Sequence, residues 1–124
     1  MEDIENRADI DKLLGLFYDK VRKDDLIGYI FNDIAKVDWA HHVPIITDFW
    51  DSILLGSQKY KGNPLKPHIR INEMIKLEEQ HFERWLHLFS TTADELFSGP
   101  KTDEAKQRAV SIATIMQIKL RETH

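Results

Sequence analysis

The sequence contains no cysteine among its 124 residues, and this absence excludes several kinds of site at once. Disulfides, zinc–thiolate centres, iron–sulfur clusters and cysteine nucleophiles all require a thiol. Proline and glycine are also sparse, at four and five residues. Two of the four prolines fall within the short stretch NPLKPHIRI, residues 63–71, which is therefore the most constrained part of the chain.

Long apolar runs and an excess of basic charge are missing as well. No apolar run approaches the roughly 18 residues of a membrane span, and the acidic start MEDIENRADI lacks the pattern of a secretory signal. A net charge of -4 opposes binding driven by nucleic-acid phosphates. We therefore expect one cytoplasmic domain over residues 1–124 that binds neither membranes nor nucleic acid.

Apolar residues recur at helical spacing through most of the chain, and no segment alternates with period two. A first helix is predicted from about Asp9 to Lys23, followed by a short helix through LIGYIF with Asp24 and Asp25 as caps. The spacing predicts an all-α domain.

The remaining helices are bounded by proline, glycine and capping residues. Pro44 predicts that the next helix starts near residue 41 or bends there, and Gly56 should end it. A strong helical pattern runs from residue 72 or 78 to Phe97, and Thr102 is expected to cap the last helix.

His68 stands directly after Pro67 in the stiff segment, where no regular amphipathic face explains it. Ligation by a single imidazole is typical of haem iron. Such a site also needs a flat apolar slot and one or two polar donors. The candidates for the slot are Phe17, Phe31, Ile46, Phe49, Trp50, Phe82 and Phe89, and the candidate donors are Tyr18, His42 and Trp85.

Each candidate donor also has an ordinary structural interpretation. His42 shares a helix face with apolar residues, Tyr18 could bond a backbone carbonyl, and Trp85 could be plain core packing. The other histidines carry less information: His81 and His87 are expected to be exposed or at a helix edge.

Several stretches together resemble the group III truncated haemoglobins. They are FYDKVRKD at 17–24, YIFND at 29–33, WAHHVPIITDFW at 39–50, YKGNPLKPH at 60–68 and HFERWLHLF at 81–89. They follow the family's order across most of the chain. The resemblance implies a shortened globin fold, a two-over-two helical sandwich around haem b.

The resemblance also implies roles for individual residues. His68 matches the proximal iron ligand, and Tyr18, His42 and Trp85 match the distal residues that face the bound gas. Phe31 matches the aromatic residue that packs on the haem face, and Ile46 matches the apolar neighbour one turn beyond the distal histidine. From the slot candidates, Phe49, Trp50 and Phe82 are expected as further haem contacts, together with Trp85. O₂, NO and CO are the expected ligands, with NO dioxygenation or a peroxide reaction, supported by a reductase, favoured over O₂ transport. A monomer or weak dimer is expected.

Two other classes of protein fit parts of the pattern. A di-iron carboxylate bundle would use Glu-x-x-His steps such as Glu78 with His81, but further inward glutamates are missing. A cofactor-free helical interaction module would leave the 12 aromatic residues with a packing role alone.

Overall fold

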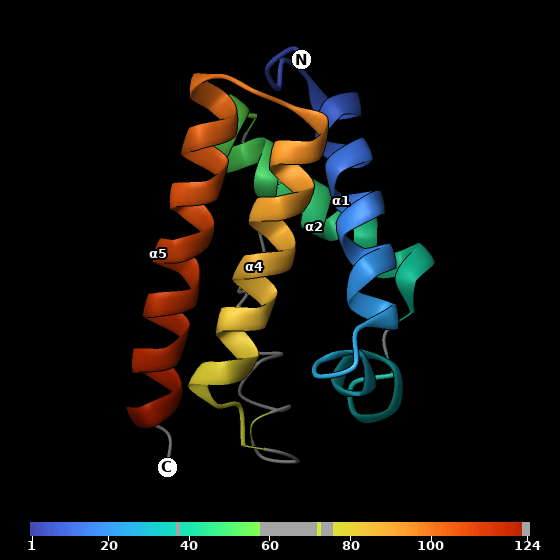
Figure 1. The fold of residues 1–124 in the computed structure, drawn as a ribbon, viewed down its shortest axis with the longest axis vertical. Helices are drawn as coiled ribbons and strands as arrows, with labels where there is room; N and C mark the ends of the chain where they lie inside the picture. The colour runs from blue at the N-terminus through green and yellow to red at the C-terminus, as the bar shows by residue number, and fades with distance from the viewer. Residues whose placement is uncertain (37, 58–71, 73–75, 123–124) are drawn as a thin grey trace.

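The computed structural model describes residues 1–36, 38–57, 72 and 76–122. Its elements are α1 (Arg7–Lys23), the π-helix η1 (Ile30–Ile34), α2 (Trp39–Leu55), α4 (Glu79–Leu96) and α5 (Pro100–Glu122) (Figure 1). No strand occurs in these ranges, so the predicted all-α class is confirmed. None of these helices is long and apolar enough to cross a membrane.

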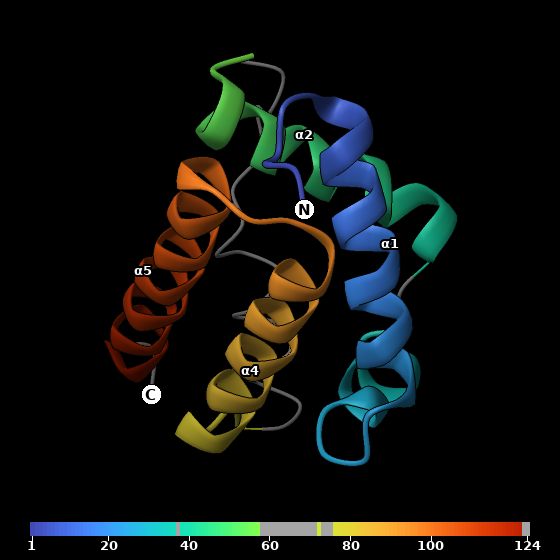
Figure 2. The same cartoon turned by 45° about the horizontal axis from the view of Figure 1, so that its top comes forward.

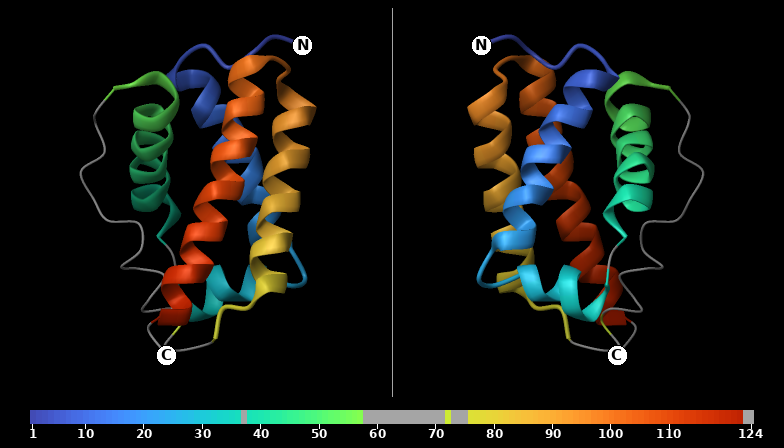
Figure 3. Two further views of the ribbon diagram at one scale, coloured as in Figure 1. Left: turned by 90° about the vertical axis from the view of Figure 1, so that its left-hand side faces the viewer. Right: turned by 90° about the vertical axis from the view of Figure 1, so that its right-hand side faces the viewer.

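The four long helices form two pairs, α1 with α2 and α4 with α5, and the pairs meet mainly where α1 contacts α4. α1 packs against α2 and α4, and α5 packs against α4 and reaches α2. Figure 2 shows α2 crossing beyond α1 and α5, while α4 and α5 lie side by side. The side views place α2 along one flank and α4 along the other (Figure 3). This is the expected two-over-two arrangement of helices.

α1 forms the centre of the core because one complete face of it is apolar. Asn6 caps its start, with the side-chain oxygen accepting from the Asp9 amide at 3.1 Å. Asp24 follows its last turn and accepts from the amides of Leu26 and Ile27, both at 3.0 Å, as a capping residue should. The buried face is Ile10, Leu13, Leu14, Phe17, Tyr18 and Val21.

α2 begins earlier than its proline predicts. The helix starts at Trp39, so Pro44 lies inside it at the sixth helical position and not within the first four. A proline there donates no backbone bond to the preceding turn. In the next turn the Thr47 hydroxyl donates to the Val43 carbonyl at 2.9 Å and to the Asp11 carboxylate on α1 at 2.9 Å. Gly56 ends the helix with a φ of 73°, as expected.

α4 begins after a reciprocal cap that changes the interpretation of one histidine. The Glu78 side chain accepts from the backbone of His81, and His81 Nδ1 accepts from the Glu78 amide at 2.9 Å. His81 is consequently buried, with 9% of its surface exposed, and the expectation of an exposed side chain is wrong. His87, in the middle of the helix, is exposed as expected.

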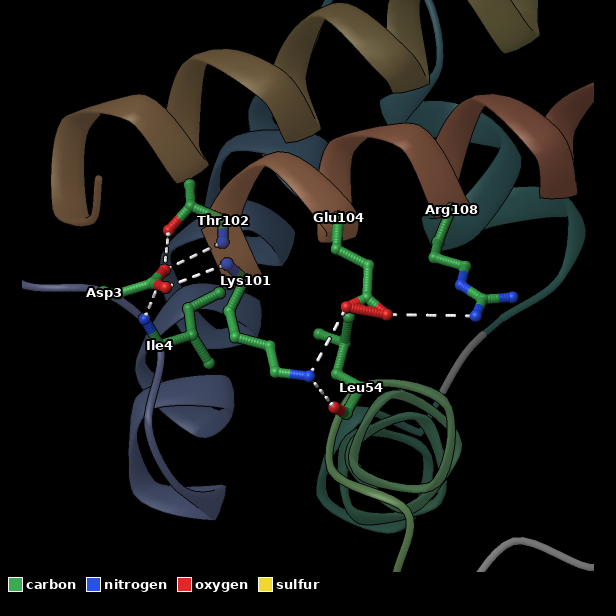
Figure 4. A network of polar contacts seen from close by, with 7 residues as sticks. All are labelled: Asp3, Ile4, Leu54, Lys101, Thr102, Glu104 and Arg108. Carbon is green, nitrogen blue, oxygen red and sulfur yellow. Dashed lines mark hydrogen bonds and ion pairs between the residues drawn. The ribbon is translucent and has the colours of Figure 1, made fainter. Parts of the chain in front are cut away.

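α5 is capped from the far end of the chain, and Thr102 is not its cap. The helix begins at Pro100, two residues before Thr102. Asp3 accepts from the amides of Lys101 and Thr102, both at 2.8 Å, and from the Thr102 hydroxyl at 2.7 Å (Figure 4). Lys101 Nζ in turn donates to the Leu54 carbonyl at 2.8 Å, joining the end of α2 to the start of α5.

Candidate functional site

The aromatic side chains of α1 and α4 meet in a continuous cluster. Phe17 contacts Trp85 and Phe89 edge-on, with ring centroids 5.7 and 5.3 Å apart. Trp85 stacks on Phe89 at 5.8 Å. Tyr18 lies against Phe17 at 4.7 Å. Edge-on and offset aromatic pairs add to the stability of a core and hold ring orientations. The cluster thus brings Tyr18 and Trp85, two of the predicted donors, together.

The Tyr18 hydroxyl is a polar group inside this apolar cluster. Burial raises the pKa of Tyr18 above its ordinary value of 10.0, and a side-chain hydrogen bond with Trp85 opposes that rise. The indole of Trp85 can only donate a hydrogen bond, whereas the hydroxyl of Tyr18 can donate and accept. The phenol therefore stays protonated near neutral pH and can itself donate a hydrogen bond.

Trp39 extends the cluster to α2 and η1, a role that the sequence did not reveal. Its ring centroid lies 5.1 Å from that of Tyr18, 6.0 Å from Phe31 and 6.3 Å from His42. The guanidinium of Arg22 lies over it at 5.4 Å. Only the Trp-x-x-His spacing hinted at this residue, and there it served as the marker for His42. Phe31 also contacts Tyr18 directly at 6.4 Å, and Trp39 is the link from His42 to Tyr18.

The other predicted contacts divide between two clusters. Trp50 is buried and stacks on Phe89 at 4.9 Å, while Ile46 and Phe49 are partly buried against the same core. Phe82 packs in a separate cluster with α5, beside Ala113, Met116 and Leu120. All the predicted slot residues except Phe82 thus pack in or against one core cluster together with Tyr18, and Phe82 belongs to the other cluster.

The predicted iron ligand, His68, lies outside the described residues. The distal half of the predicted site can be tested against haem by its chemistry. A flat apolar cofactor with a polar gas ligand requires aromatic walls and a few hydrogen-bond donors. A buried phenol and an indole N–H within an aromatic cluster meet that requirement. The residues present therefore fit the group.

The di-iron alternative finds no support among the residues that the structure describes. Glu78 and His81, its best Glu-x-x-His step, satisfy each other as the cap of α4. In the ranges that the structure describes, no three histidine or carboxylate side chains gather as a metal site would need.

Comparison with known proteins supports the globin interpretation. The chain is 36% identical over 115 residues to the group 3 truncated hemoglobin ctb of Campylobacter jejuni, covering 90% of this chain and 88% of that protein. The chain belongs to the group III truncated haemoglobins. A crystal structure of a group III truncated hemoglobin from Campylobacter jejuni superposes with a TM-score of 0.83, at 36% identity, covering 97% of this chain and 95% of that one. No family model matches the chain.

Membership in this family carries a definite consequence for the aromatic cluster. A group III truncated haemoglobin is a globin-type haem protein that binds gases, so the cofactor-free interaction module loses its basis. Tyr18, Trp85 and their neighbours are then candidates for the gas-facing side of the site.

Proposed function

We propose that this truncated haemoglobin binds haem b through His68 and holds O₂ with Tyr18 and Trp85. The observation that carries the proposal is that a buried phenol, Tyr18, and an indole donor, Trp85, both contact Phe17 inside one aromatic cluster. When bound, haem would supply an iron that binds a diatomic gas and that can change its oxidation state. The chain supplies the ligand, the walls and the donors.

The hydroxyl of Tyr18 and the indole N–H of Trp85 would stabilise bound O₂ more strongly than bound CO. O₂ accumulates negative charge on binding, and a donor aimed at charge forms a stronger hydrogen bond than one aimed at a neutral atom. CO gains little such charge, so the same donors should affect it less. His42, beside Trp39, would contribute a third polar group from α2.

A pocket with such donors releases O₂ slowly, which suits reaction better than transport. One candidate reaction joins NO, O₂ and one electron to give nitrate; the other is a reaction with peroxide. Both take place in the polar pocket, and the first needs a reductase to return the electron. The proposed setting is the cytoplasm, with the protein as a monomer or weak dimer.

Haem binding is tested by titrating the purified protein with haemin and following the Soret band. His68→Ala is the test variant, and His87→Ala is the matched control because His87 is exposed on α4. We expect a sharp band that shifts on reduction with dithionite and again with CO in the wild type and the control, and an altered or lost band in His68→Ala. Stoichiometric uptake that is the same in His68→Ala would overturn the assignment of the ligand.

The donor roles are tested by the dissociation rates of O₂ and CO. Trp85→Phe keeps an aromatic ring and removes the N–H, and Tyr18→Phe removes only the hydroxyl. Each should speed O₂ dissociation by about 10-fold, the effect of one charge-assisted hydrogen bond, with a much smaller effect on CO. Nitrate formed from NO by the oxygenated protein then distinguishes the first reaction from the second.

A further inference from the structure

We propose that Arg84 is a positioning residue for the donor pair: through its ion pair with Asp24 it holds the Trp85 indole against Phe17, beside Tyr18. The inference rests on the proposed function, since it concerns how the two donors are kept together. It adds a residue that touches neither the gas nor the cofactor.

The Arg84 guanidinium is held by two carboxylates of different character. Its Nη1 donates to Asp24 Oδ1 at 2.8 Å and to Asp25 Oδ1 at 2.9 Å. The Asp24 side chain is 9% exposed, whereas that of Asp25 is 91% exposed. Because a screened surface pair contributes little, Asp24 is the partner that matters.

Asp24 is itself fixed in place, so it can serve as an anchor. Its second oxygen, Oδ2, accepts from the amides of Leu26 and Ile27, both at 3.0 Å. These bonds orient the carboxylate at the end of α1, where Asp24 is the C-cap residue. Arg84 therefore bonds a group that cannot follow it if α4 moves.

The position of this ion pair in the chain ties it to the donors. Asp24 follows Tyr18 by six residues at the end of α1, and Arg84 immediately precedes Trp85 on α4. Neighbouring residues of a helix point about 100° apart, so fixing Arg84 toward the end of α1 also fixes the direction of Trp85. The aromatic contacts of Trp85 with Phe17 and Phe89 tolerate sliding, but a hydrogen bond from its N–H to bound O₂ depends on angle.

A second ion pair between the same helices provides a control. Lys20 Nζ bonds Glu95 Oε1 at 2.8 Å, again joining α1 to α4. Glu95 lies ten residues beyond Trp85, about 15 Å along the helix axis, and its side chain is half-exposed. If α1–α4 attachment alone mattered, losing either pair would have the same result.

The first test is a double-mutant cycle on the O₂ dissociation rate of the haem-loaded protein. The variants are Arg84→Met, Trp85→Phe and the double variant, with Glu95→Gln and Asp25→Asn as controls. We expect Arg84→Met to speed dissociation about 3- to 10-fold in the wild type and not at all in the Trp85→Phe background. Arg84→Lys should give an O₂ dissociation rate between those of Arg84→Met and the wild type. The Glu95→Gln and Asp25→Asn controls should change the dissociation rate less than twofold.

The second test needs no haem activity. The indole N–H groups of Trp39, Trp50 and Trp85 give three separate signals in a ¹⁵N-labelled sample, assigned by single Trp→Phe variants. Arg84→Met should speed hydrogen exchange of the Trp85 indole and shift its signal, while the Trp50 signal stays constant. Urea unfolding midpoints of all variants show whether each remains folded.

The outcomes separate the two proposals. If Trp85→Phe leaves O₂ dissociation unchanged, the proposed donor role fails, and the indole exchange alone then decides the positioning role. If Trp85→Phe acts but Arg84→Met does not, the inference about Arg84 is wrong. It is equally wrong if Arg84→Met acts to the same extent without Trp85, or if Glu95→Gln reproduces its effect.

Discussion

The ring of Trp39 lies 5.1 Å from the ring of Tyr18, centroid to centroid, and covers the side of the tyrosine that faces α2. Trp39 also contacts Phe31 and His42, so the first turn of α2 is attached to α1 and η1 through one indole. Arg22 lies over the same ring. Trp39 therefore covers part of the Tyr18 ring from the α2 side.

Replacing Trp39 by alanine should open this side of the cluster. Because Trp39 is only half-buried, we expect a loss of roughly 1–3 kcal/mol in the free energy of unfolding, below the range for a fully buried tryptophan. Urea unfolding measures this loss. In the haem-loaded protein, CO should also bind faster because the wall beside Tyr18 is missing.

Trp39→Phe and Arg22→Met separate the contributions to that effect. Trp39→Phe should retain most of the stability, since a ring still faces Tyr18. Arg22→Met removes the cation over the ring together with an exposed ion pair to Asp19, which contributes little, and should cost about 0.5–1 kcal/mol. A Trp39→Ala protein as stable as the wild type would show that Tyr18 is covered by other residues.

The raised pKa of Tyr18 predicts a loss of stability in alkali. The unfolded phenol ionises near 10.0, whereas burial keeps the folded one protonated to higher pH. The folded chain then binds more protons than the unfolded chain above pH 10, so the free energy of unfolding falls as pH rises from there toward the folded pKa. Urea midpoints between pH 8 and 11 measure it, and Tyr18→Phe should flatten the slope.

Much of the fold follows from periodicity, because each long helix has a continuous apolar face. The sequence was enough to select Phe17 and Tyr18 of α1 and Trp85 of α4, since all three lie on such faces. Their pairing could not be selected that way: Tyr18 and Trp85 are 67 positions apart, and helical spacing says nothing about which faces meet. The resemblance to a family supplied that step.

The errors arise where a local rule was overridden by a distant or reciprocal contact. Thr102 has the side chain of a capping residue, but the cap of α5 is Asp3, which accepts from the Thr102 amide although it lies 99 positions away in the sequence. His81 has the sequence position of a surface residue, but in the structure its ring nitrogen accepts a hydrogen bond from the Glu78 amide. Pro44 is accommodated inside α2, where the sequence rule allows only the first turn.

The Asp3 cap predicts an acid-sensitive attachment of the N-terminus. Burial works to raise the pKa of Asp3, but hydrogen bonds from Lys101, Thr102 and Ile4 outweigh it and lower the pKa below 3.8. The stabilisation is therefore present above pH 3.8 and lost as pH falls through the folded pKa. Asp3→Ala should cost about 1 kcal/mol at neutral pH, the usual value of a helix cap.

The reciprocal cap of α4 can be tested at His81, and the result bears on the donor pair because α4 carries Trp85. His81→Ala leaves the Glu78 amide without its acceptor and should reduce the free energy of unfolding by about 1 kcal/mol. His81→Asn places a neutral acceptor near the same amide and should recover part of that loss. His87→Ala, exposed on the same helix, is the matched control and should change the urea midpoint very little. A His81→Ala midpoint equal to that of His87→Ala would mean that water replaces the imidazole at no cost.

Because Trp85 lies one turn further along α4, fraying of the first turn in His81→Ala should also speed exchange of the Trp85 indole N–H, and His87→Ala should not.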